Sequence, residues 1–129
     1  MSVQYIAEEV EQFILERIDS VAQLEALLLL RDTPNEAWNA KKLAKRLYIT
    51  EEQTSVVLSG LLDQLLLTAS EDEPPRYRYE PQSAELRQLV DRLAESYARH
   101  LVPVTNLIHS KPTTRVQEFA DAFKLRKDK

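Results

Sequence analysis

Four basic residues gathered in one short stretch are the part of this sequence best suited to bind a charged partner. Lysine and arginine side chains bind phosphate groups, and they also pair with the carboxylates of acidic proteins. The cluster therefore predicts an anchor for phosphates or for an acidic partner, and the alternative is an ordinary solvated helix face. The four residues are Lys41, Lys42, Lys45 and Arg46.

Polar side chains that could read bases follow the basic cluster along the chain. Hydroxyl and amide groups form hydrogen bonds with base edges in a DNA groove. Further along, Arg76 and Arg78 flank Tyr77 and could reach a minor groove or a phosphate. The residues that we consider for base contacts are Thr50, Gln53, Thr54 and Ser55.

Residue types that support catalysis or metal binding are scarce in this chain. The two histidines, His100 and His109, are nine positions apart, which is about 13.5 Å along a helix. The sequence has no cysteine, and its single glycine, Gly60, excludes a glycine-rich phosphate loop. We therefore expect no metal site, no cofactor and no enzymatic activity.

Length and composition indicate one ordinary domain over residues 1–129. The chain is 43% hydrophobic and 29% charged, with a net charge of −4, which is typical of a folded protein. No apolar run approaches the roughly 18 residues of a membrane span, and the acidic start of the chain does not resemble a signal peptide. With no cysteine present, these features predict a cytoplasmic protein.

Helices should position the basic cluster and the polar residues after it. Helical spacing of apolar residues predicts a first helix over 3–18 and a second over 21–30 that is apolar nearly all round. Such a helix is covered on more than one side, so it should be the hub of the core. Ser20 with Gln23, and Thr50 with Gln53, form capping boxes for the second helix and for a fourth.

The basic residues themselves lie on a third, short helix, which should begin after Asn39 and cover residues 40–47. The fourth helix should run from Glu51 to about Leu66, and a β-hairpin should follow over 66–69 and 76–80. Because side chains alternate along a strand, Arg76 and Arg78 should share one face of the hairpin, and Tyr77 and Tyr79 should share the other.

A long helix beginning near Ser83 carries a heptad-like apolar stripe, which Pro103 should kink or split. After Pro112, a short amphipathic helix over 114–124 should pack on the body, and the alternative is docking on a partner or on an anionic membrane surface. The stripe, which is our candidate dimer interface, comprises Leu86, Val90, Leu93, Tyr97, Leu101, Val104 and Ile108.

The stretch from Trp38 to Ala69 resembles the winged helix-turn-helix of bacterial transcriptional regulators. Such domains combine an aromatic residue, a short helix with a Leu-Ala pair, a tight turn and a longer recognition helix, and Leu43, Ala44 and Ile49 fit that pattern. The resemblance implies a mainly α fold with a small β-hairpin. A winged-helix core would cover 20–80, with additional helices over 1–19 and 83–129.

Local charge departs from the pattern of DNA-binding relatives. The recognition helix has three acidic residues (Glu51, Glu52 and Asp63) and no basic one, a charge of −3. Leu65 also replaces the glycine that usually precedes the wing. An acidic surface opposes phosphate binding, which supplies most of the affinity for DNA.

The resemblance therefore predicts a DNA-binding transcriptional regulator that acts as a homodimer. Its phosphate contacts would come from the four-residue basic cluster together with Arg76 and Arg78. The alternative is a winged-helix module that binds another protein and makes no DNA contacts.

Overall fold

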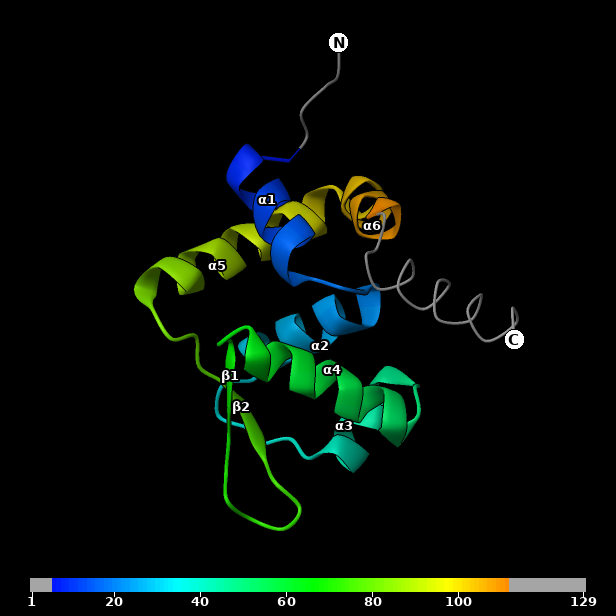
Figure 1. Ribbon diagram of the computed structural model, residues 1–129, viewed down its shortest axis with the longest axis vertical. Helices are drawn as coiled ribbons and strands as arrows, with labels where there is room; N and C mark the ends of the chain where they lie inside the picture. Colours follow the sequence, from blue (N-terminus) through cyan, green and yellow to red (C-terminus); the bar gives the residue numbers. More distant parts are fainter. Residues whose placement is uncertain (1–5, 112–129) are drawn as a thin grey trace, which may run out of the picture.

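The computed structural model describes residues 6–111, which form six helices and a two-stranded hairpin. Figure 1 shows α1, α5 and α6 together at one end and the hairpin at the other. The first five residues and the expected helix over 114–124 lie outside the described residues. The elements are α1 (Glu8–Arg17), α2 (Val21–Asp32), α3 (Ala40–Leu47), α4 (Glu51–Asp63), β1 (Leu67–Ala69), β2 (Tyr77–Tyr79), α5 (Ala84–Arg99) and α6 (Leu101–Ser110).

Helix α2 is the hub of the core, as its apolar surface predicts. Leu24, Leu27 and Leu30 are fully buried, and the neighbouring leucines pack against the same core at its edge. The helix contacts α3, α4 and β2, and in Figure 1 it lies between the α1, α5 and α6 layer and the helix-turn-helix. One chain therefore covers this apolar helix by itself.

Caps define the helix-turn-helix. The Asn39 side chain accepts a hydrogen bond from the Lys42 backbone N–H at 2.7 Å, and α3 begins there. Thr50 and Gln53 form the predicted capping box, in which each side chain accepts from the other residue's backbone N–H. Helix α4 ends at Asp63, earlier than predicted, because Leu65 adopts a left-handed conformation with φ of 65°.

Only one of the two hydrogen bonds of the capping box expected at Ser20 forms. The Ser20 hydroxyl accepts from the Gln23 backbone N–H, but the Gln23 side chain accepts from Asp19, at 2.6 Å, instead of Ser20. Gln23 is buried between α2 and α4, where a Cβ on Gly60 would lie 2.5 Å from its amide nitrogen. The single glycine thus permits the close approach of these two helices.

The hairpin pairs Leu67 with Tyr79 and Ala69 with Tyr77 in an antiparallel register. On the other side of β2, the Trp38 and Tyr77 backbones exchange hydrogen bonds of 3.1 and 2.7 Å. This bridge ties the segment before α3 to the wing. The wing and the segment that leads into the basic cluster are therefore connected through backbone hydrogen bonds.

The long C-terminal helix is split at His100, three residues before Pro103. A proline ring clashes with the carbonyl four residues earlier, which here belongs to Arg99, the last residue of α5. Pro103 itself lies in the first turn of α6, where a missing N–H costs little. Among residues 6–111, none of the helices combines the length and apolar character that a bilayer-spanning segment requires.

Candidate nucleic-acid interface

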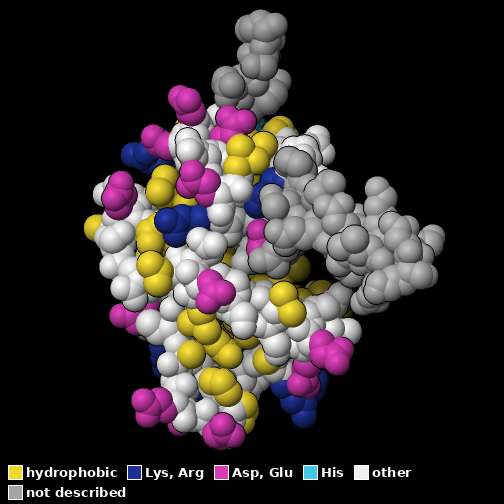
Figure 2. Space-filling model, viewed as in Figure 1, with side chains coloured by type: hydrophobic (Ala, Val, Ile, Leu, Met, Phe, Trp, Pro, Cys, Tyr) yellow, Lys and Arg dark blue, Asp and Glu magenta, His cyan; other side chains and the backbone are white. Residues whose placement is uncertain are grey.

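Helix α3 presents its cations to solvent on one side and its apolar residues to the core on the other. Leu43 and Ala44 are buried, whereas the basic residues are exposed. We call this the α3 basic surface, and it comprises Lys41, Lys42, Lys45 and Arg46. In Figure 2, dark blue side chains gather over α3, next to the acidic side chains at the start of α4.

Most cations elsewhere in the described chain are already bound to protein groups. Arg92 pairs with Glu9, Arg31 with Asp91 at 2.9 Å, and Arg17 donates to the Gln64 carbonyl at 3.1 Å. The Lys111 ammonium group donates to the Ile18 carbonyl at 2.6 Å. Weaker contacts are a cation–π contact of Arg87 with Tyr79 and the exposed Arg99–Glu95 pair.

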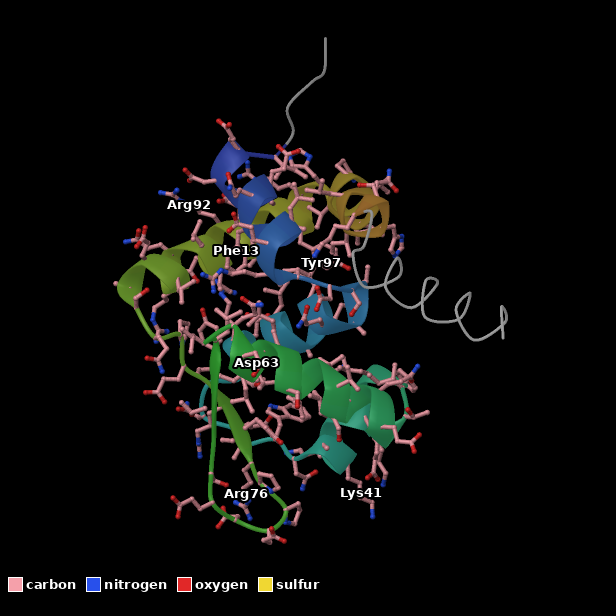
Figure 3. All side chains as sticks on the ribbon, in the orientation of Figure 1. Phe13, Lys41, Asp63, Arg76, Arg92 and Tyr97 are labelled. Atoms are coloured by element: carbon pink, nitrogen blue, oxygen red, sulfur yellow. The ribbon has the colours of Figure 1, made fainter. Side chains whose placement is uncertain are left out.

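By contrast, most cations of the α3 basic surface and the wing are not paired with protein groups of the described chain. Within residues 6–111, the side chains of Lys41, Lys45, Arg46 and Arg76 form no hydrogen bond or ion pair. Figure 3 shows Lys41 and Arg76 pointing away from the body at the same end of the molecule. Four uncompensated cations at one end of a molecule with net charge −4 create a local site for anions.

Lys42 is more constrained than its neighbours. Its ammonium group lies 4.6 Å from the centroid of the Trp38 ring and 3.9 Å from a carboxylate oxygen of Glu36. The Trp38 indole donates to Thr33 at 3.0 Å, so the ring is fixed beneath this lysine. Lys42 is therefore oriented by a cation–π contact that needs no strong salt bridge.

Helix α4 offers a different exposed face from the one expected. Thr54 was expected to face bases, but it is fully buried and its hydroxyl donates to the Thr50 carbonyl at 2.8 Å. The Gln53 side chain is used in the capping box. The exposed face instead includes Ser55, Ser59 and Val56, which is 64% exposed.

Spacing alone could have revealed this face. Thr54 lies three and four positions before Val57 and Leu58, both buried, and therefore belongs to the apolar stripe of α4. Val56 lies on the opposite side, where an exposed valine is unexpected. The helical period therefore predicts that Thr54 is buried, although its polar side chain suggested an exposed position.

The wing places its aromatic and basic residues as strand alternation predicts. Tyr77 and Tyr79 pack against the core, and Arg78 is exposed and donates to the Pro34 carbonyl at 3.4 Å. The Tyr79 hydroxyl is buried, and burial raises the pKa of Tyr79 above its usual value of 10.0. Arg76 and Arg78 are thus both exposed on the wing, and among the described residues the Arg76 side chain makes no contact like that of Arg78 with Pro34.

The predicted dimer stripe lies mostly inside the single chain. Val90, Leu93, Val104 and Ile108 are fully buried in the core, and Leu86 and Tyr97 are partly buried. Tyr97 also donates to Glu25 at 3.0 Å. Of the stripe, Leu101 is exposed (54%), and next to it Val102 is 62% exposed.

The histidines lie at opposite ends of α6. His100 caps its start and His109 lies in its last turn. In the part of the chain that the structure describes, His, Asp and Glu side chains form no cluster of three that could hold a metal ion.

Solved structures that resemble this chain are winged-helix regulators. MepR of Staphylococcus aureus, a transcription regulator of the multidrug efflux pump MepA, aligns with a TM-score of 0.55 at 15% identity, over 94% of this chain and 87% of MepR. A MepR variant bound to an oligodeoxyribonucleotide aligns with the same TM-score and identity. A MarR-family regulator from a Rhodococcus species aligns with a TM-score of 0.51 at 18% identity, over 90% of this chain and 79% of its own.

No protein-family model and no curated protein matches this sequence. The structural likeness nevertheless extends beyond the helix-turn-helix to most of each chain. The chain therefore has the winged-helix fold of MarR-family transcriptional regulators, which confirms the predicted fold class.

Proposed function

We propose that this chain is a transcriptional regulator that binds duplex DNA as a homodimer. The observation that carries the proposal is the placement of its free cations. Lys41, Lys45, Arg46 and Arg76 lie on the helix-turn-helix and the wing, the elements that contact DNA in winged-helix proteins. A protein with the same fold is bound to an oligodeoxyribonucleotide in a solved structure, which supports nucleic acid as the partner.

The phosphate contacts would come from the α3 basic surface, with Arg76 and Arg78 on the wing. Helix α4 would then approach the bases without adding to the attraction, since its first turn carries Glu51 and Glu52. Among the base-contact candidates, Ser55 is exposed on this face, and Thr50 and Gln53 lie at its start. Thr54 leaves the set because its side chain is buried.

The homodimer would use exposed apolar residues of α6. Leu101 and Val102 lie at the end of the molecule opposite the wing, where their contact would leave the basic surface free. An isologous contact at this end would present two helix-turn-helix units to one duplex.

A second function is a protein-docking module, and one feature of α4 favours it. Val56 is exposed between serines and close to an acidic first turn, a surface better suited to a protein with apolar and basic groups than to a phosphate backbone. In that case, the α3 basic surface would contribute to docking or remain solvated.

Fluorescence anisotropy with mixed-sequence duplex DNA, titrated over a range of salt concentrations, separates these functions. We expect salt-sensitive binding whose log–log slope falls by about 0.9 for each phosphate contact removed. Lys45→Glu should weaken binding to every sequence. The matched control is Arg99→Glu, an exposed cation of α5 outside the helix-turn-helix, which should leave binding unchanged. Absence of salt-sensitive binding at low ionic strength would favour the docking module.

A further inference from the structure

An open hollow beside α3 combines aromatic and cationic side chains. Its volume is about 480 Å³, and it is lined by Trp38, Lys42, Lys45, Arg46 and Tyr48. Three of these five residues are cations and none is acidic, although Glu36 lies 3.9 Å from the Lys42 ammonium group. The hollow therefore suits a ligand that is both flat and negatively charged.

Tyr48 is the open aromatic wall of this hollow. Trp38 is buried and its ring is covered by Lys42, whereas Tyr48 is 92% exposed at the turn between α3 and α4. Tyr48 also adopts left-handed backbone angles (φ 61°, ψ 42°), which glycine or asparagine tolerates better than an aromatic residue does. Neither burial nor backbone preference explains a tyrosine at this position.

The position of the cations relative to Tyr48 defines the ligand class. Lys42, Lys45 and Arg46 lie on one face of α3, spaced by three and four residues, and Tyr48 follows at the C-terminal end of that face. Exposed aromatic rings next to cations bind nucleic acid by stacking on a base while the cations hold its phosphates. A paired base inside a duplex presents its edges and not its faces, so stacking requires an unpaired base.

We propose that this hollow binds an unpaired nucleotide of a nucleic acid, with the base stacked on Tyr48 and the flanking phosphates on Lys45 and Arg46. The proposal rests on nucleic-acid binding by the α3 basic surface and adds a preference for DNA that contains unpaired bases.

The test compares three labelled DNAs of one sequence: a blunt duplex, the same duplex with a single-stranded extension, and the single strand. Wild-type protein should bind the extended duplex and the single strand more tightly than the blunt duplex. Tyr48→Phe should keep this preference. Tyr48→Asn should weaken binding to both DNAs with unpaired bases by roughly 5- to 150-fold, the range for loss of one stacked base. It should also leave blunt-duplex affinity unchanged.

The Tyr48→Asn variant should fold, so a loss of binding would not result from unfolding. Asparagine suits the left-handed backbone at this position and should raise the melting temperature. Trp38, the only tryptophan in the sequence, provides a second readout, since its fluorescence should change when the single strand fills the hollow. Equal effects of Tyr48→Asn on all three DNAs, or no effect on any, would overturn the inference but not the proposed binding of the wild-type protein to duplex DNA. Failure of wild-type protein to bind any of the DNAs would overturn the proposed function as well.

Discussion

At the scale of single residues, the left-handed position before the wing is the clearest departure from local preference. Leu65 adopts φ of 65° and is 49% exposed, so a side chain that disfavours this conformation also buries little surface. Left-handed geometry costs a non-glycine residue roughly 1–2 kcal/mol. Comparison with winged-helix proteins predicted an unusual residue here, and the structure supplies the physical reason.

We expect Leu65→Gly to raise the free energy of unfolding by about 1 kcal/mol, because it removes the strain and loses little packing. Urea unfolding would measure the change. The matched control is Leu15→Gly in α1, where a leucine of similar exposure has ordinary helical geometry. That variant should lower the free energy of unfolding by about 1 kcal/mol. Loss of stability in both variants would show that packing of Leu65 outweighs its strain.

The buried hydroxyl of Tyr79 is a second residue-scale feature with a measurable consequence. It has no hydrogen-bond partner among the described residues, so Tyr79→Phe should be neutral or should stabilise the protein by up to about 1 kcal/mol. Tyr97→Phe is the contrast, because it removes the hydrogen bond to Glu25 and should destabilise the protein. Destabilisation by Tyr79→Phe would indicate that the hydroxyl is satisfied in solution.

Tyr79 also affects how stability changes with pH. Burial, with a smaller contribution from Asp91, raises its pKa in the folded protein, so the unfolded chain ionises first, near pH 10.0. The contribution of the neutral phenol is therefore fully present below pH 10 and is lost as pH rises towards the raised pKa. Tyr79→Phe should lessen the loss of stability above pH 10 in urea unfolding at several pH values. An unchanged alkaline dependence would contradict this assignment.

At the scale of elements, two lysines of helix α3 lie at the end of the helix where positive charge is unfavourable. Its first turn contains Lys41 and Lys42 and no acidic residue, although the N-terminus of a helix favours negative charge. Lys45 and Arg46, in the last turn, have the favourable arrangement. Within residues 6–111, Lys41 has no compensating contact of the kind that Lys42 makes with Trp38, so it contributes least to folding, which supports a role in binding.

Lys41→Glu should therefore separate stability from binding. The new carboxylate should stabilise α3 by about 0.3–1 kcal/mol, while the reversed charge weakens DNA binding and lowers its salt dependence. Thermal unfolding and anisotropy would measure the two effects. Lys45→Glu is the matched reversal at the other end of the helix, and it should weaken binding and stability together. If Lys41→Glu leaves DNA binding unchanged, this end of α3 makes no phosphate contact.

Element boundaries were predictable where a cap marks them and unpredictable where tertiary contacts decide. Asn39 and Thr50 fixed the starts of α3 and α4 from local hydrogen-bonding chemistry. The burial of Gln23 against Gly60 depends on how α2 crosses α4, which no local pattern specifies. Pro103 predicted the break before α6, but the packing of α5 and α6 against α1 is a tertiary feature that no local pattern specifies.

At the scale of the whole molecule, the apolar stripe of the C-terminal helices shows a limit of periodicity. A repeat of three and four residues indicates that one face is buried, but a face covered by the same chain and a face covered by a partner have the same pattern. Here the chain itself buries Val90, Leu93, Val104 and Ile108. The part of the stripe that is exposed for assembly is therefore smaller than the sequence suggested, and within residues 6–111 it is Leu101, at the start of α6.

This distribution leads to a prediction about assembly. Val102→Glu places a charge on a side chain that is 62% exposed, so the chain should still fold while the proposed homodimer dissociates. Light scattering would give the mass, and circular dichroism would verify the helices. The matched control is Val56→Glu on α4, which is equally exposed and should leave the assembly intact.

The monomer made by Val102→Glu should also separate general from specific DNA binding. It retains the α3 basic surface, so its salt-sensitive binding to mixed-sequence duplex should persist. A palindromic site engages both subunits of a dimer at once, and the monomer should lose that advantage in effective concentration, a loss on the order of 100-fold or more. If Val102→Glu remains dimeric, another surface forms the interface. If the wild type is itself a monomer at high micromolar concentration, each chain binds DNA alone.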